Sequence, residues 1–210
     1  MSRLRVAPIV EGDGEVVCVP ILLRRIWGEL LGGEYVEVVK PTRGKRQLLV
    51  KSGELEKLMP LALEKLRNPP ESTDPALVLI LIDADEDCPK ALGPSLLNRA
   101  RKVCPPEIGV ACVLAKHKYE TWFAATAESL SSYLGLPFDF CASENPEDLF
   151  FKKAWVETHF QAQGKKYSKT IDQPKLTSAM DLALCRKRSP SFDKLCRELE
   201  RRLQKNQAMG

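Results

Sequence analysis

The chain of 210 residues has no apolar run long enough to cross a bilayer, since its purest apolar stretches, 76–82 and 16–23, are far too short. Its first residues lack the basic, apolar and small-residue order of a secretion signal. It also has no G-x-x-x-x-G-K-[ST] phosphate loop and no G-x-S-x-G nucleophile elbow. We therefore expect a soluble, cytoplasmic protein that does not bind membranes and by itself performs neither ATP hydrolysis nor acyl transfer.

Paired metal-binding cysteines are absent as well. The chain has seven cysteines, an odd number, with no C-x-x-C pair among them, and only two histidines. Several of the cysteines fall at apolar positions of the expected helices and strands. We therefore expect no zinc site of the usual spacing and interpret the cysteines as buried, reduced thiols.

The composition is that of an ordinary globular protein, with 44% hydrophobic and 29% charged residues, but the net charge of +4 is unevenly divided. Residues 152–205 hold 14 lysines and arginines against 6 acidic residues, whereas residues 1–151 hold 18 against 22. A basic segment beside an acidic one is typical of proteins whose basic part meets phosphate while the acidic part holds metal. A solvated helical surface is the alternative.

The first part of the chain alternates between short apolar runs and amphipathic segments. The run 76–82 is apolar throughout, which indicates a central strand buried on both faces. Because parallel neighbours need crossovers, the alternation predicts an α/β fold with a mainly parallel, four-stranded sheet flanked by helices. The expected strands are 5–10, 35–40, 76–82 and 108–115, and the expected helices are 15–31, 48–66 (interrupted or restarted at Gly53 or Pro60), 89–103 and 121–134.

Beyond Pro137 the pattern changes to short helices, expected at 146–160, 176–186 and 192–204. Ser189 is a candidate N-cap for the last of these, with Pro190 at its first position. We therefore predict an α/β domain over 1–136 and a basic, helical C-terminal extension over 137–210 that packs on it.

Acidic residues follow three of the predicted strands. Glu11 and Glu15 come after the first strand, an Asp-rich loop after the third, and Glu120 near the end of the fourth. The carboxyl ends of parallel strands meet at one edge of a sheet, where ligands bind. Asp83 and Asp85 point the same way if the extended backbone continues to Asp85. The alternative is that these acids only form turns and helix caps.

Carboxylates that converge in this way repel one another, and their pKa values rise unless a cation neutralises them. A hard divalent ion with oxygen ligands suits such a group better than zinc does. The acids therefore predict a site for Mg²⁺ or Mn²⁺ that keeps positions open for phosphate oxygens.

The motifs Glu11-Gly12-x-x-Glu15 and Asp83-x-Asp85 resemble those of the Toprim domain found in topoisomerases, primases and OLD-family nucleases. The segments E-T-W-F at 120–123 and S-P-S-F at 189–192 are similar to segments of small bacterial Toprim-like proteins. The resemblance covers nearly the whole chain. It implies a parallel, Rossmann-like Toprim sheet and, as in OLD-like members, a metal-dependent nuclease that often works with an ATPase in phage defence.

The resemblance also implies roles for individual residues. Glu11 matches the first Toprim glutamate, Glu15 the second acid of OLD-like motifs, and Asp83 with Asp85 the D-x-D pair. OLD-like nucleases carry a further acid cluster and a lysine for a second metal, so the number of metals stays open here. The candidates for this additional set are Glu120, Lys116 and Lys118.

The resulting hypothesis is a nuclease that uses Mg²⁺ or Mn²⁺ on nucleic acid, with DNA favoured. Lys116 is preferred to Lys118 as the cation that neutralises phosphate, because it lies closer to the strand end. The predicted catalytic residues are Glu11, Glu15, Asp83, Asp85 and Lys116. The predicted metal ligands are Glu11, Asp83, Asp85, Asp87 and Glu120. The predicted nucleic-acid contacts are Arg43, Lys45, Arg46, Lys118, Lys165, Lys166, Arg186, Lys187 and Arg188, with Lys169 on the same basic surface.

Several alternatives remain at this point. His117 is either a general acid or incidental, and Trp122, Phe123 and Trp155 either stack on bases or belong to the core. The rival hypothesis for the whole chain is a catalytically weak adaptor or sensor that binds nucleic acid or an ATPase partner. A receiver-like phosphotransfer domain ranks lowest, because it needs paired acids after the first strand. A homodimer stays open.

Overall fold

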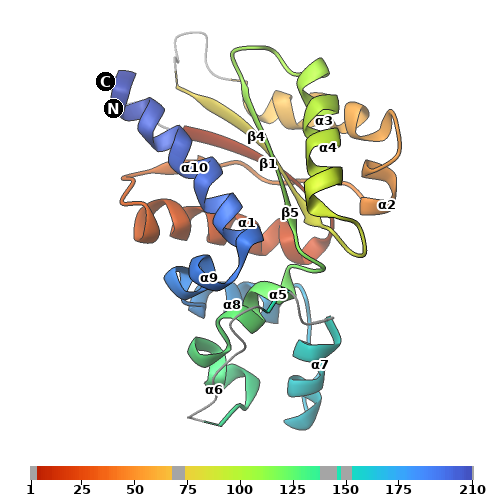
Figure 1. Ribbon diagram of the computed structural model, residues 1–210, viewed down its shortest axis with the longest axis vertical. Helices are drawn as coiled ribbons and strands as arrows, with labels where there is room; N and C mark the ends of the chain where they lie inside the picture. Colours follow the sequence, from red (N-terminus) through yellow and green to blue (C-terminus); the bar gives the residue numbers. More distant parts are fainter. Residues whose placement is uncertain (1–3, 68–73, 138–145, 148–152, 210) are drawn as a thin grey trace.

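The computed structural model describes residues 4–67, 74–137, 146–147 and 153–209, and these form a parallel β-sheet between two layers of helices (Figure 1). The sheet has the order β2-β1-β4-β5, and β3 also pairs with β1. All of these pairings are parallel, which confirms the predicted α/β class. The strands are β1 (Leu4–Val10), β2 (Val36–Val38), β3 (Thr42–Arg43), β4 (Ala76–Asp83) and β5 (Gly109–Ala115).

The prediction of four strands was one too few. Residues 41–46 were expected to be a loop, but Thr42 and Arg43 pair with Ile9 and Val10 at the end of β1. The edge of the sheet beside β1 is therefore built from two short pieces, β2 and β3. A strand of two residues has no alternation that could be recognised in the sequence.

The central strand β4 shows why its sequence is apolar throughout. Leu77, Leu79 and Leu81 belong to one hydrophobic core, and Val78 and Ile80 to the other. Successive side chains of a strand point to opposite faces, so a strand covered on both sides needs apolar residues at every position. The prediction of a strand buried on both faces is confirmed.

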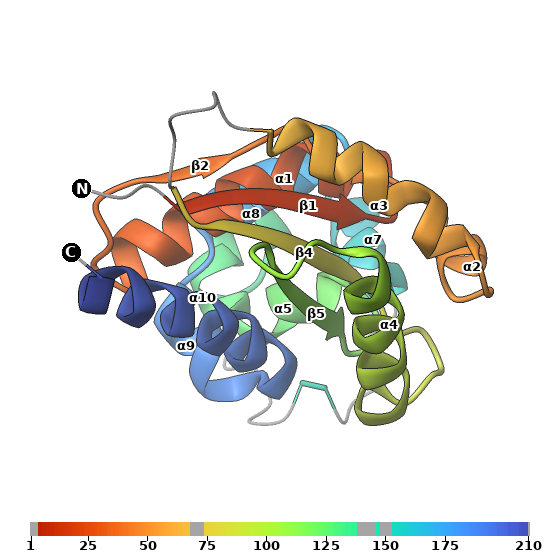
Figure 2. The same cartoon turned by 90° about the horizontal axis from the view of Figure 1, so that it is seen from above.

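Each face of the sheet has its own helical layer (Figure 2). Helices α2 (Arg46–Leu49), α3 (Glu54–Lys65) and α4 (Pro89–Val103) cover one face. The core on the other face is formed by α1 (Asp13–Arg25) and its π-helical continuation (Ile26–Leu30), together with α8 (Asp172–Ala179), α9 (Leu182–Arg188) and α10 (Pro190–Met209). Within the described ranges, no helix is long and apolar enough to cross a membrane.

Three expected helices are divided in the structure. Gly53, with a left-handed φ of 84°, separates α2 from α3 inside the expected helix 48–66. The expected helix 121–134 consists of α5 (Glu120–Ala125), a 3₁₀ turn (Ala127–Leu130) and α6 (Ser131–Leu134). The interruption falls at Thr126, whose backbone is not helical, with a φ of −128° and a ψ of 29°. Its hydroxyl bonds back to the carbonyl of Trp122 at 3.4 Å.

The expected helix 176–186 is divided for a different reason. Asp181 has an extended backbone, and its side chain accepts a hydrogen bond from the Leu184 amide at 2.9 Å. Asp181 therefore caps a new helix, α9, instead of continuing α8. The expected helix 146–160 corresponds to α7 (Lys153–Ala162), and most of its expected first turns lie outside the described residues.

The start of α10 agrees with the prediction. The Ser189 hydroxyl accepts a hydrogen bond from the Phe192 amide at 3.1 Å, so Ser189 is the N-cap. Phe192, Leu195 and Leu199 are buried and join the same core as β1 and β5. The C-terminal helices therefore share a hydrophobic core with the sheet and pack directly on it.

The cysteines behave largely as buried thiols. Cys18, Cys112, Cys185 and Cys196 are buried, and none of the described cysteines forms a disulfide. Burial raises the pKa of Cys112 to about 12, which keeps it in the unreactive thiol form. Cys88 is exposed, contrary to the general expectation, and Cys141 lies outside the described residues.

Candidate functional site

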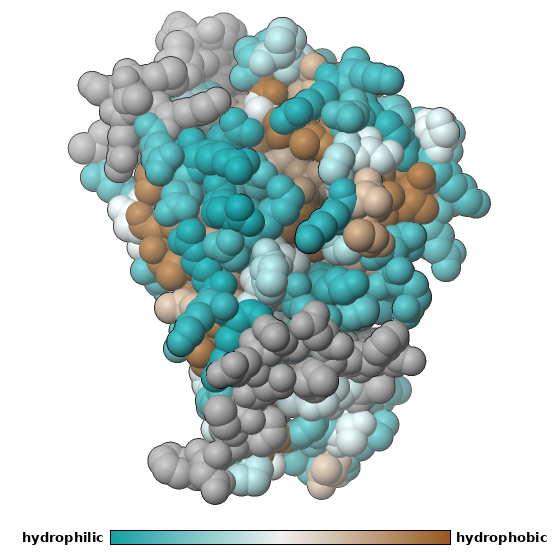
Figure 3. Space-filling model, viewed as in Figure 1, coloured by the Kyte–Doolittle hydropathy of each residue, from teal (hydrophilic) through white to brown (hydrophobic). Residues whose placement is uncertain are grey.

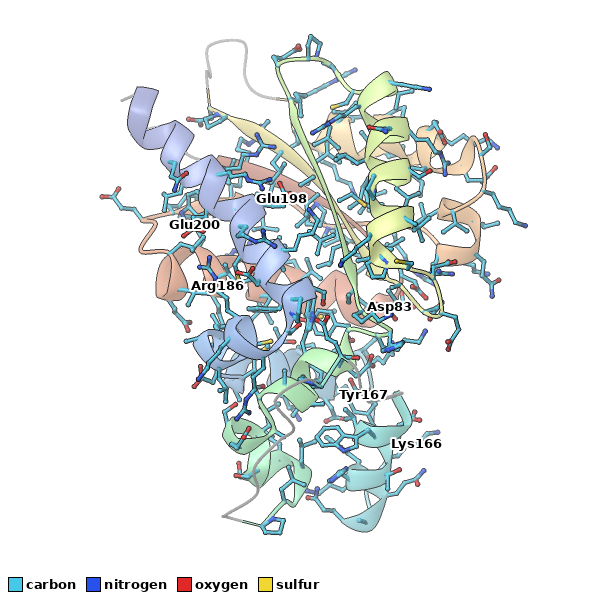
Figure 4. The ribbon with its side chains drawn as sticks, in the orientation of Figure 1. Asp83, Lys166, Tyr167, Arg186, Glu198 and Glu200 are labelled. Atoms are coloured by element: carbon cyan, nitrogen blue, oxygen red, sulfur yellow. The ribbon has the colours of Figure 1, made fainter. Side chains whose placement is uncertain are left out.

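Four acidic residues from three strand ends converge at the carboxyl edge of the sheet. Glu11 follows β1, Glu15 lies in the first turn of α1, Asp83 ends β4, and Glu120 begins α5. Asp83 is 5% exposed and Glu120 is 2% exposed. Burial and the charges of Glu120, Glu11 and Glu15 raise the pKa of Asp83 well above its ordinary value. Figure 4 shows Asp83 at the end of the sheet beside α5.

Two glycines allow the first acidic motif to fold around this site. A Cβ atom at Gly12 would lie 2.5 Å from Oε2 of Glu15, so the glycine leaves room for the glutamate to fold back. A Cβ atom at Gly14 would lie 2.0 Å from Oε1 of Gln173, which comes from α8. The Gly-x-Gly spacing therefore serves close packing around the carboxylates.

Asp83 and Asp85 are brought together differently from the expectation. Asp85 has a left-handed backbone with a φ of 50°, so the extended backbone does not continue to it. Its amide donates a hydrogen bond to the carbonyl of His117, which is also left-handed, with a φ of 61°. This short antiparallel bridge brings the β4 and β5 loops together and places both aspartates within reach of Lys118.

Lys118, and not the preferred Lys116, is the lysine of this cluster. Its ammonium bonds to Asp85 and lies 3.6 Å from Oδ2 of Asp83. Burial disfavours its charge, but the hydrogen bond to Asp85 and the charge of Asp83 outweigh this and raise its pKa. Among the described residues, the Lys116 ammonium makes no ion pair with the acids. The left-handed turn at His117 explains the reversal, because nearness to the strand end does not determine the direction of a side chain.

The C-terminal segment supplies three residues that sequence reasoning did not place at this site. Lys169 lies 3.3 Å from Oε1 of Glu120 and 3.5 Å from Oε1 of Glu15. Gln173 donates to Glu15 at 3.2 Å, and the Tyr167 hydroxyl donates to Glu120 at 3.4 Å. Lys169, expected on an open basic surface, is therefore an internal counter-ion of the acids. The segment's basic composition gave no signal for this, because only the packing of α8 on α1 brings it here.

The S-P-S-F segment supports the loop that carries Lys118. The Ser191 hydroxyl accepts hydrogen bonds from Nε1 of Trp122 at 2.9 Å and from the Lys116 amide at 3.3 Å. Glu147 in turn accepts a bond from the Ser191 amide at 2.9 Å. The start of α10 therefore fixes the segment between β5 and α5. Trp122 and Phe123 are buried core residues. Trp155 is half-buried, and its ring lies 4.5 Å from that of His159 at a tilt of 46°.

Two carboxylate oxygens of the site are buried without a hydrogen-bond partner, Oε2 of Glu11 and Oε2 of Glu120. Buried carboxylate oxygens without donors are costly, and a hard cation is the ligand that their chemistry suits. The donor set therefore fits Mg²⁺ or Mn²⁺. In the part of the chain that the structure describes, however, no three acidic, histidine or cysteine side chains are already gathered as metal ligands. Lys118 and Lys169 supply the neutralising charge instead.

Arg46 and Asp87 do not have the surroundings that their predicted roles require, which were a nucleic-acid contact and a metal ligand. The Arg46 side chain is only 10% exposed and donates to the carbonyls of Asp83 at 2.9 Å and Ala84 at 2.8 Å. It also pairs with Asp85 and with Asp87, which is 55% exposed. Arg46 therefore braces the Asp-rich loop instead of facing phosphate, and Asp87 points to Arg46 instead of joining the buried acids.

The remaining basic residues divide into two groups. Arg186 pairs with Asp193 and Glu200, and Arg188 pairs with Glu128, so only Lys187 of that run is exposed and without an ion pair among the described residues. The second group is exposed and belongs to two segments that contact the acidic edge, since β3 pairs with the end of β1 and Tyr167 bonds to Glu120. Arg43, which pairs with Asp13, and Lys45 come from one of these segments. Lys165 and Lys166 come from the other, next to Tyr167, and Figure 4 labels Lys166 and Tyr167.

Residues 10–200 match the family described as "Domain of unknown function (DUF4276)". The chain belongs to this family. The match includes both acidic motifs, Glu120 after β5, and the turn before α8 that carries Lys169. No curated protein and no solved structure matches the chain.

Proposed function

We propose that this member of the DUF4276 family is a Toprim-like phosphodiesterase that uses Mg²⁺ or Mn²⁺ to cleave nucleic acid, with DNA as the favoured substrate. The observation that carries the proposal is the pair of partnerless, buried oxygens on Glu11 and Glu120 beside Asp83. They come from different strand ends and share one edge of a parallel sheet, which is where ligands bind in such folds.

In this proposal Glu11, Asp83 and Glu120 would hold the cation, and Asp85 would join them on release from Lys118. A bound divalent cation supplies Lewis acidity and lowers the pKa of a bound water. Lys118 then lies beside the site as a cation for the charge on a phosphate oxygen. Glu15 is held by Gln173 and orients the first acidic motif.

The exposed cations around the acids give the substrate a place to lie. Arg43 ends β3, which pairs with β1, and Lys45 follows it. Lys165 and Lys166 precede Tyr167, whose hydroxyl bonds to Glu120. Cations on two sides of an acidic site hold a phosphate backbone without reading its sequence. We place this activity in the cytoplasm, working with an ATPase partner in phage defence.

A second candidate function is the catalytically weak adaptor. The observation that favours it is that Lys118 and Lys169 already neutralise the acids. A metal has to displace these ammonium groups, and a protein that only binds nucleic acid or an ATPase does not need this exchange.

The test is cleavage of supercoiled plasmid and of single-stranded DNA in Mg²⁺ or Mn²⁺, with an EDTA control. Asp83→Asn removes the charge but keeps an oxygen for the hydrogen bond that the Tyr119 amide donates at 2.8 Å. We expect it to lower the rate roughly 100-fold or more. Glu86→Gln is the matched control, since Glu86 is exposed in the same loop and should leave the rate unchanged.

Calorimetric titration with Mn²⁺ separates the two candidates. The nuclease proposal expects saturable binding that Asp83→Asn weakens and Glu86→Gln does not. Absence of both Mn²⁺ binding and cleavage would overturn it in favour of the adaptor. The next step is then an ATPase partner captured with the intact chain.

A further inference from the structure

A second site lies at the opposite end of strand β5, in a groove between α4 and α10. Two adjoining cavities of about 640 and 350 Å³ share Arg101, Val110 and Arg202 in their walls. Helices α4 and α10 belong to the cores on opposite faces of the sheet and lie on either side of the edge strand β5 (Figure 2). Residues of both helices and of β5 line the cavities. Figure 3 shows hydrophobic surface between hydrophilic side chains on this side of the molecule.

The groove is strongly basic. Lys194, Arg201, Arg101 and Arg202 line it, and Glu198 is the one acid among its lining residues. The Glu198 carboxylate already accepts bonds from Lys194 at 3.0 Å and from Arg201 at 3.1 Å. Arg101 and Arg202 therefore have no carboxylate partner within the described part of the chain.

Arg202 lies in the wall of the groove, and part of its guanidinium group has no hydrogen-bond acceptor. Its Nε is buried and makes no hydrogen bond. Its guanidinium lies against strand β5, where a Cβ atom on Gly109 would be 3.0 to 3.1 Å away. Burial and the charges of Arg101 and Arg201 lower its pKa, and Glu198 only partly offsets them. Two guanidinium groups that repel each other in a partly buried groove call for an anion between them.

The floor of the smaller cavity has a different character. Pro105, Pro106 and Ile108 line it next to Arg101 and Arg202. Leu97 and Val110 add apolar surface to the larger cavity. A ligand that satisfies both parts is anionic at one end and apolar and flat at the other, and the larger volume is typical of a small-molecule site.

We propose that this groove binds a mononucleotide, with its phosphates on Arg101 and Arg202 and its base on the Pro105–Ile108 wall. The site is separate from the acids, because β5 runs from Gly109 in the groove to Ala115 beside Asp83, about 20 Å along the strand. It is therefore a ligand site additional to the proposed phosphodiesterase centre and does not depend on it.

The experiment is isothermal titration of the full chain with AMP, ATP, inorganic phosphate and adenosine, in EDTA so that the acidic site holds no metal. We expect saturable binding of AMP or ATP, at least tenfold tighter than of phosphate or adenosine. Arg101→Met and Arg202→Met should each weaken it at least tenfold. Lys102→Gln should not, because Lys102 is exposed on the same helix and lines neither cavity.

Thermal melting keeps the test independent of folding defects. Without nucleotide, Arg202→Met should melt at or above the temperature of the original chain, since it removes a repelled, partly buried charge. ATP should raise the melting temperature of the original chain and of Asp83→Asn, but not of Arg202→Met. The proposal is overturned if no mononucleotide binds, if adenosine binds as tightly as AMP, if both arginine variants bind normally, or if only an oligonucleotide binds.

Discussion

The two ends of the sheet carry opposite charges, and these charges are neutralised in opposite ways. At the carboxyl ends, Glu15 and Glu120 are buried beside Lys169, and Asp83 lies beside Lys118. At the start of β5, Arg101 and Arg202 have no carboxylate of their own among the described residues. The acidic edge thus contains its own counter-ions, whereas the basic groove lacks them.

This difference sets what each end needs from a ligand. A cation that enters the acidic edge must displace two ammonium groups, and its binding energy is reduced by the lost ion pairs. An anion that enters the groove displaces only water and relieves repulsion between arginines. At the acidic edge, a bound cation is therefore expected to replace the lysine ammonium groups. In the basic groove, a bound anion is expected to supply a negative charge that the protein lacks there.

The largest expected effect on stability comes from removing the lysine that neutralises the buried glutamates. Lys169→Met leaves the carboxylates of Glu15 and Glu120 buried without their ammonium partner, so we expect a loss of about 3 kcal/mol in the free energy of unfolding at pH 8. Urea denaturation measures it.

Lys165→Met is the matched control, because Lys165 is exposed four residues away and its ammonium group bonds only to Gln163 in the described structure. Added Mn²⁺ should restore part of the stability of the Lys169 variant and little of the control's. Equal stability of the two variants would show that the lysine does not neutralise the site.

A smaller effect, of opposite sign, is expected from removing one acid. The pKa values of Asp83 and Glu11 lie above their ordinary values of 3.8 and 4.5. The folded protein therefore retains protons that the unfolded chain releases, and its stability falls as the pH rises from about 4.5 through these raised values. Asp83→Asn should raise the free energy of unfolding by about 1–3 kcal/mol at pH 8 and flatten its decline between pH 5 and 8.

Urea unfolding at both pH values checks this, with Glu86→Gln as the surface control. A variant that is less stable than the original chain at pH 8 would mean that the charge of Asp83 is fully compensated by Lys118. In that case the acidic edge is a closed ion-pair network and not a site awaiting a cation.

The acidic edge also shows how far a sequence can be interpreted. The apolar run of β4 and the acids behind three strands were sufficient to predict a parallel sheet with Glu11, Asp83 and Glu120 at one edge, because strand ends obey simple geometry. Helix α4 was predicted with its observed bounds, since Pro89 and the apolar periodicity define it.

What failed depended on contacts between distant parts of the chain. Nothing near Lys169 distinguishes it from its exposed neighbours Lys165 and Lys166, and only the close approach of α8 to Gly14 brings it to Glu15. Lys118 contacts the acids instead of the preferred Lys116, and a left-handed His117 cannot be recognised from residue type alone. The basic groove was missed for the same reason: Arg101 and Arg202 are a hundred positions apart in sequence.

The smallest expected effect decides which end of the sheet meets DNA. Lys165 and Lys166 are exposed and precede Tyr167, which bonds to Glu120, so replacing both with Gln should weaken binding of a labelled single-stranded oligonucleotide several-fold. The slope of log affinity against log salt should fall by about 1 to 2, as two phosphate contacts are lost. Fluorescence anisotropy between about 50 and 200 mM salt measures both.

Arg101→Met and Lys187→Gln should change neither the affinity nor the slope, because Arg101 lies in the nucleotide groove and Lys187 on α9. If Arg101→Met has the larger effect, the polynucleotide follows the basic groove, and the contrast between a metal edge and a small-molecule edge is lost.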